Sequence, residues 1–103
     1  MLPTVLMAED EINLFHFWLD DKIQDGISYN GEIFCCLCTL PPKYRAQLYH
    51  YACCLSQKDS VVITLADQQC SLWVSLRSPN LGMLKTQKID ESTIDELFER
   101  PTE

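Results

Sequence analysis

The segment 32–40 constrains the fold of this chain more than any other. Its sequence, Glu-Ile-Phe-Cys-Cys-Leu-Cys-Thr-Leu, is apolar at both odd and even positions. A strand formed here would carry apolar side chains on both faces, so it has to lie inside a sheet that is covered on both sides. Pro41 and Pro42 follow directly; proline cannot continue a strand ladder but can begin a helix. The sequence therefore predicts a central strand followed at once by a helix.

The patterns within 42–76 predict a helix followed by two strands. Apolar residues recur with helical spacing through 42–56, which predicts a helix with one buried stripe: Tyr44, Leu48, Tyr51, Ala52 and Leu55. Segment 60–66 is rich in β-branched residues and 70–76 alternates, so we expect two strands joined by a hairpin loop at 67–69. In that pairing one face carries Val61, Ile63, Leu65, Leu72, Val74 and Leu76, which leaves Trp73 on the other face.

The two ends of the chain read as helical. Segment 9–23 begins with three acidic residues and carries Ile12, Phe15, Leu19 and Ile23 at helical spacing, which predicts an amphipathic helix. Turn dipeptides follow at 25–26 and 30–31. After a turn at 78–82 we expect an edge strand over 83–89 and then a short helix, whose apolar stripe is Ile94, Leu97 and Phe98 and which Pro101 ends.

Together these elements predict one α+β domain over 1–103, with residues 90–103 as an acidic amphipathic tail. The expected order is α-β-α-β-β-β-α, with a mainly antiparallel sheet of about four strands, two main helices and a short C-terminal helix. A length of 103 residues fits one domain, and a hydrophobic content of 47% excludes a disordered chain.

The charge is unevenly distributed. The formal net charge is -7; residues 1–30 and the tail from Asp90 each contribute -5, and the middle contributes +3. A net acidic chain without a basic stripe lacks the positive surface that nucleic-acid binding requires. The acidic ends could instead attract a basic partner.

The chain has no basic leader and no apolar run of membrane-spanning length, so we expect a cytoplasmic protein with no membrane contact and with reduced cysteines. Cys36 and Cys38 are expected to share a strand face, and His50 and Cys54 lie one helical turn apart. With Cys70 they are the candidate metal ligands, but burial as small hydrophobic side chains explains them better. We expect no cofactor and no catalytic residues.

Apolar side chains on a second surface give the main functional signal. On a helical wheel Leu14, Phe17 and Trp18 lie opposite Ile12 and Ile23, and Trp73 lies on the second face of the predicted hairpin. These four residues, together with Ile94, Leu97 and Phe98 in the tail, are the predicted partner-binding residues. The sequence favours a non-catalytic protein that acts through contact with another protein or as a homodimer, as an adaptor, assembly factor or regulator. The alternatives are a thiol-based redox or metal-binding protein and a small cysteine-dependent enzyme.

Overall fold

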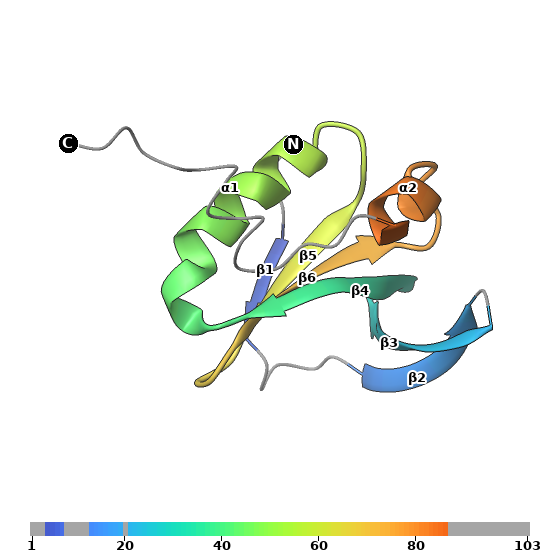
Figure 1. The fold of residues 1–103 in the computed structure, drawn as a ribbon, viewed down its shortest axis with the longest axis horizontal. Coiled ribbons are helices and arrows are strands. Elements are labelled where there is room, and N and C mark those ends of the chain that lie inside the picture. The colour runs from blue at the N-terminus through green and yellow to red at the C-terminus, as the bar shows by residue number, and fades with distance from the viewer. Residues whose placement is uncertain (1–3, 8–12, 20, 87–103) are drawn as a thin grey trace.

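Figure 1 shows the fold in a computed structural model, which describes residues 4–7, 13–19 and 21–86. The strands are β1 (Thr4–Met7), β2 (Asn13–Leu19), β3 (Lys22–Tyr29), β4 (Glu32–Leu40), β5 (Val61–Leu65) and β6 (Cys70–Ser75). A 3-10 helix, η1 (Pro42–Tyr44), leads into the main helix α1 (Arg45–Leu55), and a short helix, α2 (Leu81–Thr86), follows β6. The chain is therefore an α+β domain, as predicted.

The strands form one mixed sheet in the order β1-β5-β6-β4-β3-β2. Only β1 and β5 are parallel, and the other four described pairings are antiparallel. Strand β4 lies between β6 and β3, which confirms the interior strand predicted over 32–40. The sheet has six strands where the sequence suggested about four, because β1, β2 and β3 were not predicted as strands, whereas the described part of the edge strand expected over 83–89 is helical.

Both helices cover the same face of the sheet, here called the helix face. The core on this face combines Leu48 and Ala52 of α1 and Leu84 of α2 with strand residues such as Ile63 and Leu72. Tyr51 and Leu55 pack against it, so the predicted helix over 42–56 and its apolar stripe are confirmed. The first turn of this helical segment is 3-10. Pro42 lies at its N-terminus, where no helical hydrogen bond requires the backbone N–H that proline lacks.

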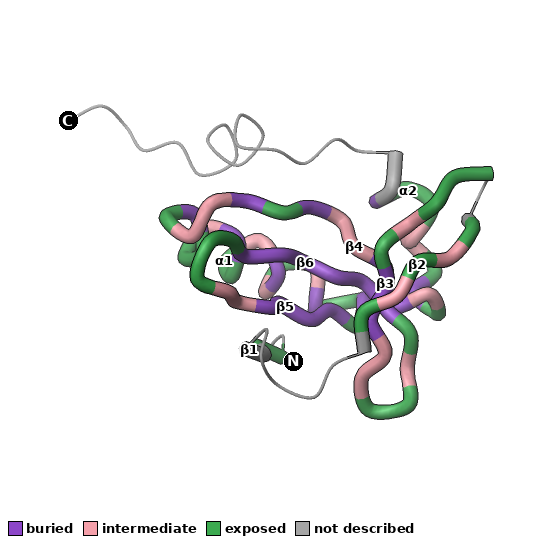
Figure 2. Tube along the Cα trace, turned by 90° about the horizontal axis from the view of Figure 1, so that it is seen from below, coloured by how far each residue is buried: buried purple, intermediate pink, exposed green. Residues whose placement is uncertain are grey.

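The opposite face, here called the open face, carries a smaller core made of Ile27, Phe34, Val62 and Trp73. The predicted hairpin of β5 and β6 is confirmed by its register, in which Val62 pairs with Trp73. Trp73 does lie on the opposite face from Leu72 and Val74, but it is buried there. Figure 2 shows the contrast along the sheet, since β5 and β6 are buried over most of their length whereas much of β2 and β3 is not.

The helix predicted over 9–23 is wrong for the residues that the structure describes. Residues 13–19 and 22–29 form a hairpin of two antiparallel strands, with Leu19 paired to Lys22. Residues 9–12 and 20 lie outside the described part. The run Leu-Phe-His-Phe-Trp-Leu is rich in aromatic side chains, which favour strands, and Asp21 adopts the left-handed backbone (φ 63°) that a two-residue turn requires.

The two predicted turn dipeptides have different outcomes. Asn30 and Gly31 both have positive φ and connect β3 to β4, which confirms that turn. Asp25 and Gly26 instead lie inside β3. Glycine is needed there because a Cβ on Gly26 would lie 2.7 Å from Cε1 of Phe17 and 3.1 Å from Cε2 of Phe15. Gly26 thus marks the close approach of two aromatic rings and not a turn.

The edge strand predicted over 83–89 is also corrected, because residues Leu81–Thr86 form α2. The backbone N–H of Leu84 donates to the carbonyl of Asn80 at 2.9 Å, and Leu84 is buried against the helix-face core. Leu81 and Leu84 are three residues apart and both pack against this core, which favours a helix over a strand. Residues 87–103 lie outside the described part, including the tail residues Ile94, Leu97 and Phe98. Neither of the described helices has the length and apolar character that a membrane span requires.

Candidate functional site

Three large apolar side chains lie exposed on the open face of the β2–β3 hairpin. Leu14 is 68% exposed, Trp18 is 70% exposed and Ile23 is 62% exposed. Leu14 and Trp18 are four residues apart on β2, so they lie on the same side of the strand. Ile23 pairs directly with Trp18 across the hairpin. We call these three residues the hairpin surface.

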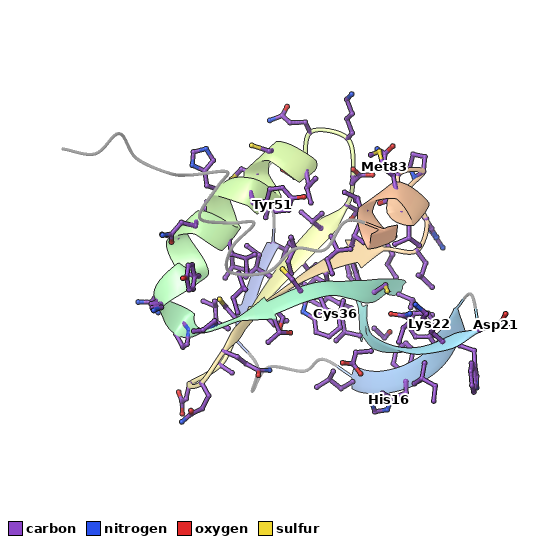
Figure 3. The ribbon with its side chains drawn as sticks, viewed as in Figure 1. His16, Asp21, Lys22, Cys36, Tyr51 and Met83 are labelled. Carbon is purple, nitrogen blue, oxygen red and sulfur yellow. The ribbon has the colours of Figure 1, made fainter. Side chains whose placement is uncertain are left out.

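A polar pair lies in the middle of the hairpin surface. His16 pairs with Asp25 in the register, and its Nε2 lies 3.1 Å from Oδ1 of Asp25. Both side chains are exposed. Figure 3 shows His16 on β2 and Asp21 at the turn end of the hairpin, well away from Tyr51 on α1. The hairpin surface therefore combines apolar side chains with exposed acidic groups.

The predicted residue Phe17 lies on the other side of the hairpin. It shares that side with Phe15, and the two ring centroids are 5.9 Å apart. Both rings are partly buried and pack over Gly26. Phe17 is therefore separated from Leu14 and Trp18 by the strand itself and supports the hairpin from the helix-face side.

Trp73 is part of the fold. It is 5% exposed, and its Nε1 donates a hydrogen bond of 2.9 Å to Oγ1 of Thr64. The structure thus places Leu14 and Trp18 on one side of β2 and removes Trp73 from the accessible surface. Ile23, which the helical reading assigned to the core stripe, joins the hairpin surface. Its position between the polar residues Lys22 and Gln24, four residues before Ile27, fits one side of a strand and is the signal that could have identified it.

A cavity of about 120 Å³ adjoins the hairpin surface on the open face, between Leu14 and Asp25 of the hairpin and the β5–β6 end of the sheet. The hydroxyl groups of Thr39 and Ser71 in its lining bond to each other, with Thr39 Oγ1 and Ser71 Oγ 2.9 Å apart. The volume is below the roughly 300 Å³ at which small-molecule sites begin. This cavity suits one inserted side chain better than a metabolite.

The six cysteines do not gather into one site. A register shift between Cys36 and Cys38 against β6 marks a bulge, which turns their side chains to opposite faces of the sheet. The expectation that they share a face is therefore wrong: Cys36 packs with the open-face cluster, and Cys38 lies in the helix-face core. None of the six cysteines, all of which lie in the described residues, forms a disulfide bond.

Burial makes two of these thiols poor nucleophiles. The pKa of Cys38 is raised from 9.0 to about 12, chiefly by burial and in addition by the neighbouring thiols of Cys36 and Cys70. Burial also raises the pKa of Cys70, against the opposing effect of Arg45. Since the thiolate is the reactive and metal-binding form, these shifts disfavour chemistry at both positions.

The raised pKa of Cys38 predicts a pH dependence of stability. The folded protein holds this proton to about pH 12, whereas the unfolded chain releases it near pH 9.0. The contribution is therefore fully present below pH 9 and is lost as the pH rises toward 12. Between pH 8 and pH 10 the free energy of unfolding should fall by about 1 kcal/mol on account of Cys38. Urea unfolding should show a smaller fall in Cys38→Ala, and an equal fall in both proteins would contradict the assignment.

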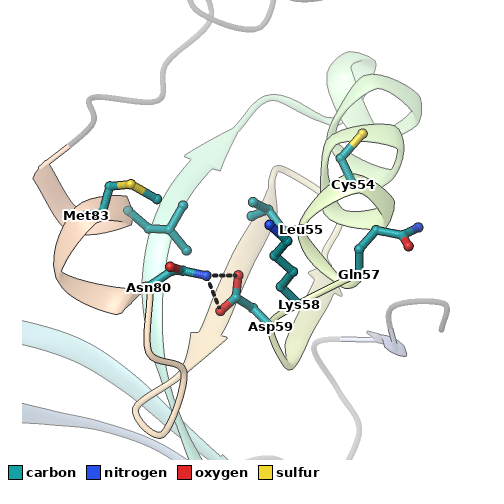
Figure 4. A pocket seen from close by; sticks show the side chains of 8 residues that line it. Cys54, Leu55, Gln57, Lys58, Asp59, Asn80 and Met83 are labelled. Atoms are coloured by element: carbon teal, nitrogen blue, oxygen red, sulfur yellow. Dashed lines mark hydrogen bonds between the residues drawn. The ribbon is translucent and has the colours of Figure 1, made fainter.

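His50 and Cys54 are both exposed on α1. Cys54 lines an open groove of about 380 Å³ between the end of α1 and α2 (Figure 4). His50 does not line this groove. The groove's carboxylate belongs to Asp59, which is buried and accepts hydrogen bonds from Asn80 Nδ2 at 3.3 Å to each oxygen. That contact joins the turn before β5 to the turn before α2, which is a structural role.

Within residues 4–7, 13–19 and 21–86, no three His, Cys, Asp or Glu side chains come together in an arrangement that could hold a metal ion. The hairpin surface is therefore the best-defined candidate site in the described part of the chain. Comparison of the chain with protein-family models, with curated proteins and with solved structures finds no match.

Proposed function

We propose that this protein acts by binding another protein, and that the hairpin surface is its contact site. One observation carries the proposal: Leu14, Trp18 and Ile23 lie on one side of the hairpin with most of their surface exposed, and the other side of the hairpin packs inward. Burying a large apolar side chain contributes about 1.5–3 kcal/mol. Three such side chains, one of them a tryptophan, are typical of the centre of a protein interface.

The charges around the hairpin surface indicate the kind of partner. Asp21 and Asp25 are exposed on the hairpin, Lys22 is its only lysine or arginine, and residues 1–30 contribute -5 to the net charge. Exposed carboxylates at the rim of an interface accelerate association with a basic partner more than they add affinity. A partner with a basic rim around an apolar centre fits this surface best.

The cysteine-based alternatives draw less support from the described residues. Thiol chemistry or metal binding would need neighbouring, ionisable thiols, but Cys36 and Cys38 lie on opposite faces and burial raises the pKa of Cys38 and Cys70. A cysteine-dependent enzyme would need His50 beside a thiol and a carboxylate in one pocket, and the groove at Cys54 does not include His50.

The proposal predicts that Leu14→Ser combined with Trp18→Ser removes partner binding while the protein stays folded. Tagged full-length chain would be cross-linked in cells, and the captured proteins would be quantified by mass spectrometry. We expect at least a tenfold loss of the specific partner, since two apolar anchors are removed. Thermal unfolding should be nearly unchanged, because both side chains are exposed.

The matched control replaces two exposed apolar side chains away from the hairpin surface, as Ile33→Ser with Met83→Ser. This control should keep the partner. Equal capture by both double variants would contradict the proposal. Loss of folding in the hairpin variant would also contradict it, because the two side chains would then belong to the core.

A further inference from the structure

We propose that the outer edge of β2 accepts an extended segment of the partner as an additional strand, and that this segment alternates Lys or Arg with apolar residues. This inference rests on the proposed function and names the partner's chemistry and its mode of binding. It follows from three features of the hairpin: an edge strand that pairs with no second strand among the described residues, the direction of its backbone groups, and its charge.

Strand β2 is the last strand of the sheet, and among the described residues it pairs only with β3. It has seven residues, whereas β1 at the other end of the sheet has four. Natural sheets protect their edges with proline, with lysine or by keeping the strand short. The sequence of β2, Asn-Leu-Phe-His-Phe-Trp-Leu, has none of these features. A long, apolar, unprotected edge is the usual template for strand addition.

The register determines which backbone groups point outward. Leu19 and Lys22 flank a two-residue turn, so this pair exchanges backbone hydrogen bonds. Alternation then directs the N–H and C=O groups of Phe15 and Phe17 toward β3. Those of Leu14, His16 and Trp18 point away from β3. The residues that offer free backbone groups are thus the residues whose side chains form the open face of β2.

An added strand would therefore make two kinds of contact at once. Its backbone would bond to Leu14, His16 and Trp18, and its side chains on the open face would lie beside the side chains of these same residues. Main-chain bonds of this kind give affinity, and the side-chain neighbours give specificity. Apolar residues of the partner would cover Leu14 and Trp18.

Charge indicates which of the possible occupants fits the edge of β2 best. The hairpin exposes Asp21 and Asp25, the chain as a whole carries -7, and residues 90–103 contribute -5. A second copy of this chain, or its own acidic tail, would bring like charges together. A basic segment would bring opposite charges together, because the negative charge of the hairpin would attract its Lys or Arg side chains. Charge complementarity thus selects a basic extended partner.

The test uses the full-length chain and a synthetic nine-residue peptide, Lys-Val-Lys-Ile-Lys-Val-Lys-Ile-Lys, with binding measured by titration calorimetry. Amide hydrogen exchange should slow at Leu14, His16 and Trp18 when this peptide binds, and affinity should fall as salt rises. A peptide with Glu in place of Lys should bind at least tenfold more weakly. A Lys peptide with N-methyl groups on alternate amides should also bind at least tenfold more weakly, because it cannot donate to the edge.

Two substitutions of His16 distinguish the contribution of its backbone N–H to peptide binding from the contribution of its side chain. His16→Pro removes an outward N–H and leaves the bonds to β3 in place, whereas His16→Ala removes only the imidazole. We expect at least a tenfold loss of peptide affinity in His16→Pro and less than a threefold change in His16→Ala. Equal affinities in the two variants would overturn strand addition. A dimer of the free protein with slow exchange at the same amides would make a second copy the occupant and would also overturn it.

The two proposals can fail separately. If the cellular partner is lost by Leu14→Ser with Trp18→Ser but is retained by His16→Pro, the hairpin surface binds a partner without strand addition. If the partner is retained by the hairpin variant as well, the proposed function itself is wrong.

Discussion

Replacing Trp73 with alanine should lower the free energy of unfolding by about 3–5 kcal/mol. Its ring is 5% exposed and packs with Ile27, Phe34 and Val62 on the open face. The substitution leaves a cavity among these side chains and removes the hydrogen bond from Trp73 Nε1 to Thr64 Oγ1. Thr64 is itself 7% exposed, so its hydroxyl would lose a buried partner. Urea unfolding followed by circular dichroism measures the change.

Trp18 provides the matched control, because it is the same residue type in the opposite environment. With 70% of its surface exposed, Trp18→Ala should change the free energy of unfolding by no more than about 0.5 kcal/mol. Similar losses for the two substitutions would show that Trp18 is part of the core and would remove the basis of the hairpin surface.

The second large effect concerns the packing that holds the hairpin. Gly26→Ala should destabilise the protein by about 1–3 kcal/mol, because the added Cβ would lie 2.7 Å from the ring of Phe17 and would have to displace it. Phe17 packs beside Phe15, so the displacement would disturb both rings. Thermal unfolding of the full-length chain measures the change.

Gly82 supplies the comparison for this substitution. A Cβ on Gly82 would meet nothing within 4 Å, and the residue lies in α2. Alanine is favoured over glycine in a helix, so Gly82→Ala should stabilise the protein by about 0.5–1 kcal/mol. If Gly26→Ala stabilised the protein to the same extent, the two rings would not pack over Gly26.

The central strand and the helix after it were predicted correctly, because the sequence pattern over 32–42 fits only one structure. Segment 32–40 is apolar on both faces, so only an interior strand satisfies it, and Pro42 permits a helix but not another strand residue in a ladder. The β5–β6 hairpin was equally predictable from its β-branched residues and its alternation.

The N-terminal hairpin was missed because its spacing fits two structures. Ile12, Phe15, Leu19 and Ile23 recur at helical intervals, but the same segment is rich in the aromatic residues that favour a strand. What decides the structure is tertiary: Gly26 admits the rings of Phe15 and Phe17, and Ile27 packs with Phe34 of β4. Neither contact is visible in a local pattern, and both favour strands.

The same ambiguity explains which site residues were predicted. Leu14 and Trp18 are four residues apart, which places them on one side of a helix and also on one side of a strand. Phe17 is three residues from Leu14, which is the same side in a helix and the opposite side in a strand. Trp73 was expected on an accessible face because the alternation of 70–76 places it on the side opposite Leu72 and Val74, but Ile27 and Phe34 pack against it there.

Hydroxyl-radical footprinting of the free protein and of its native complex recovered from cells tests the central claim most directly. We expect Trp18 to be oxidised readily in the free protein and to be protected at least fivefold in the complex. Trp73 should be protected in both states, because its ring is buried in the fold. Equal oxidation of Trp18 in the two states, or protection of Trp18 already in the free monomer, would contradict a partner-binding role for the hairpin surface.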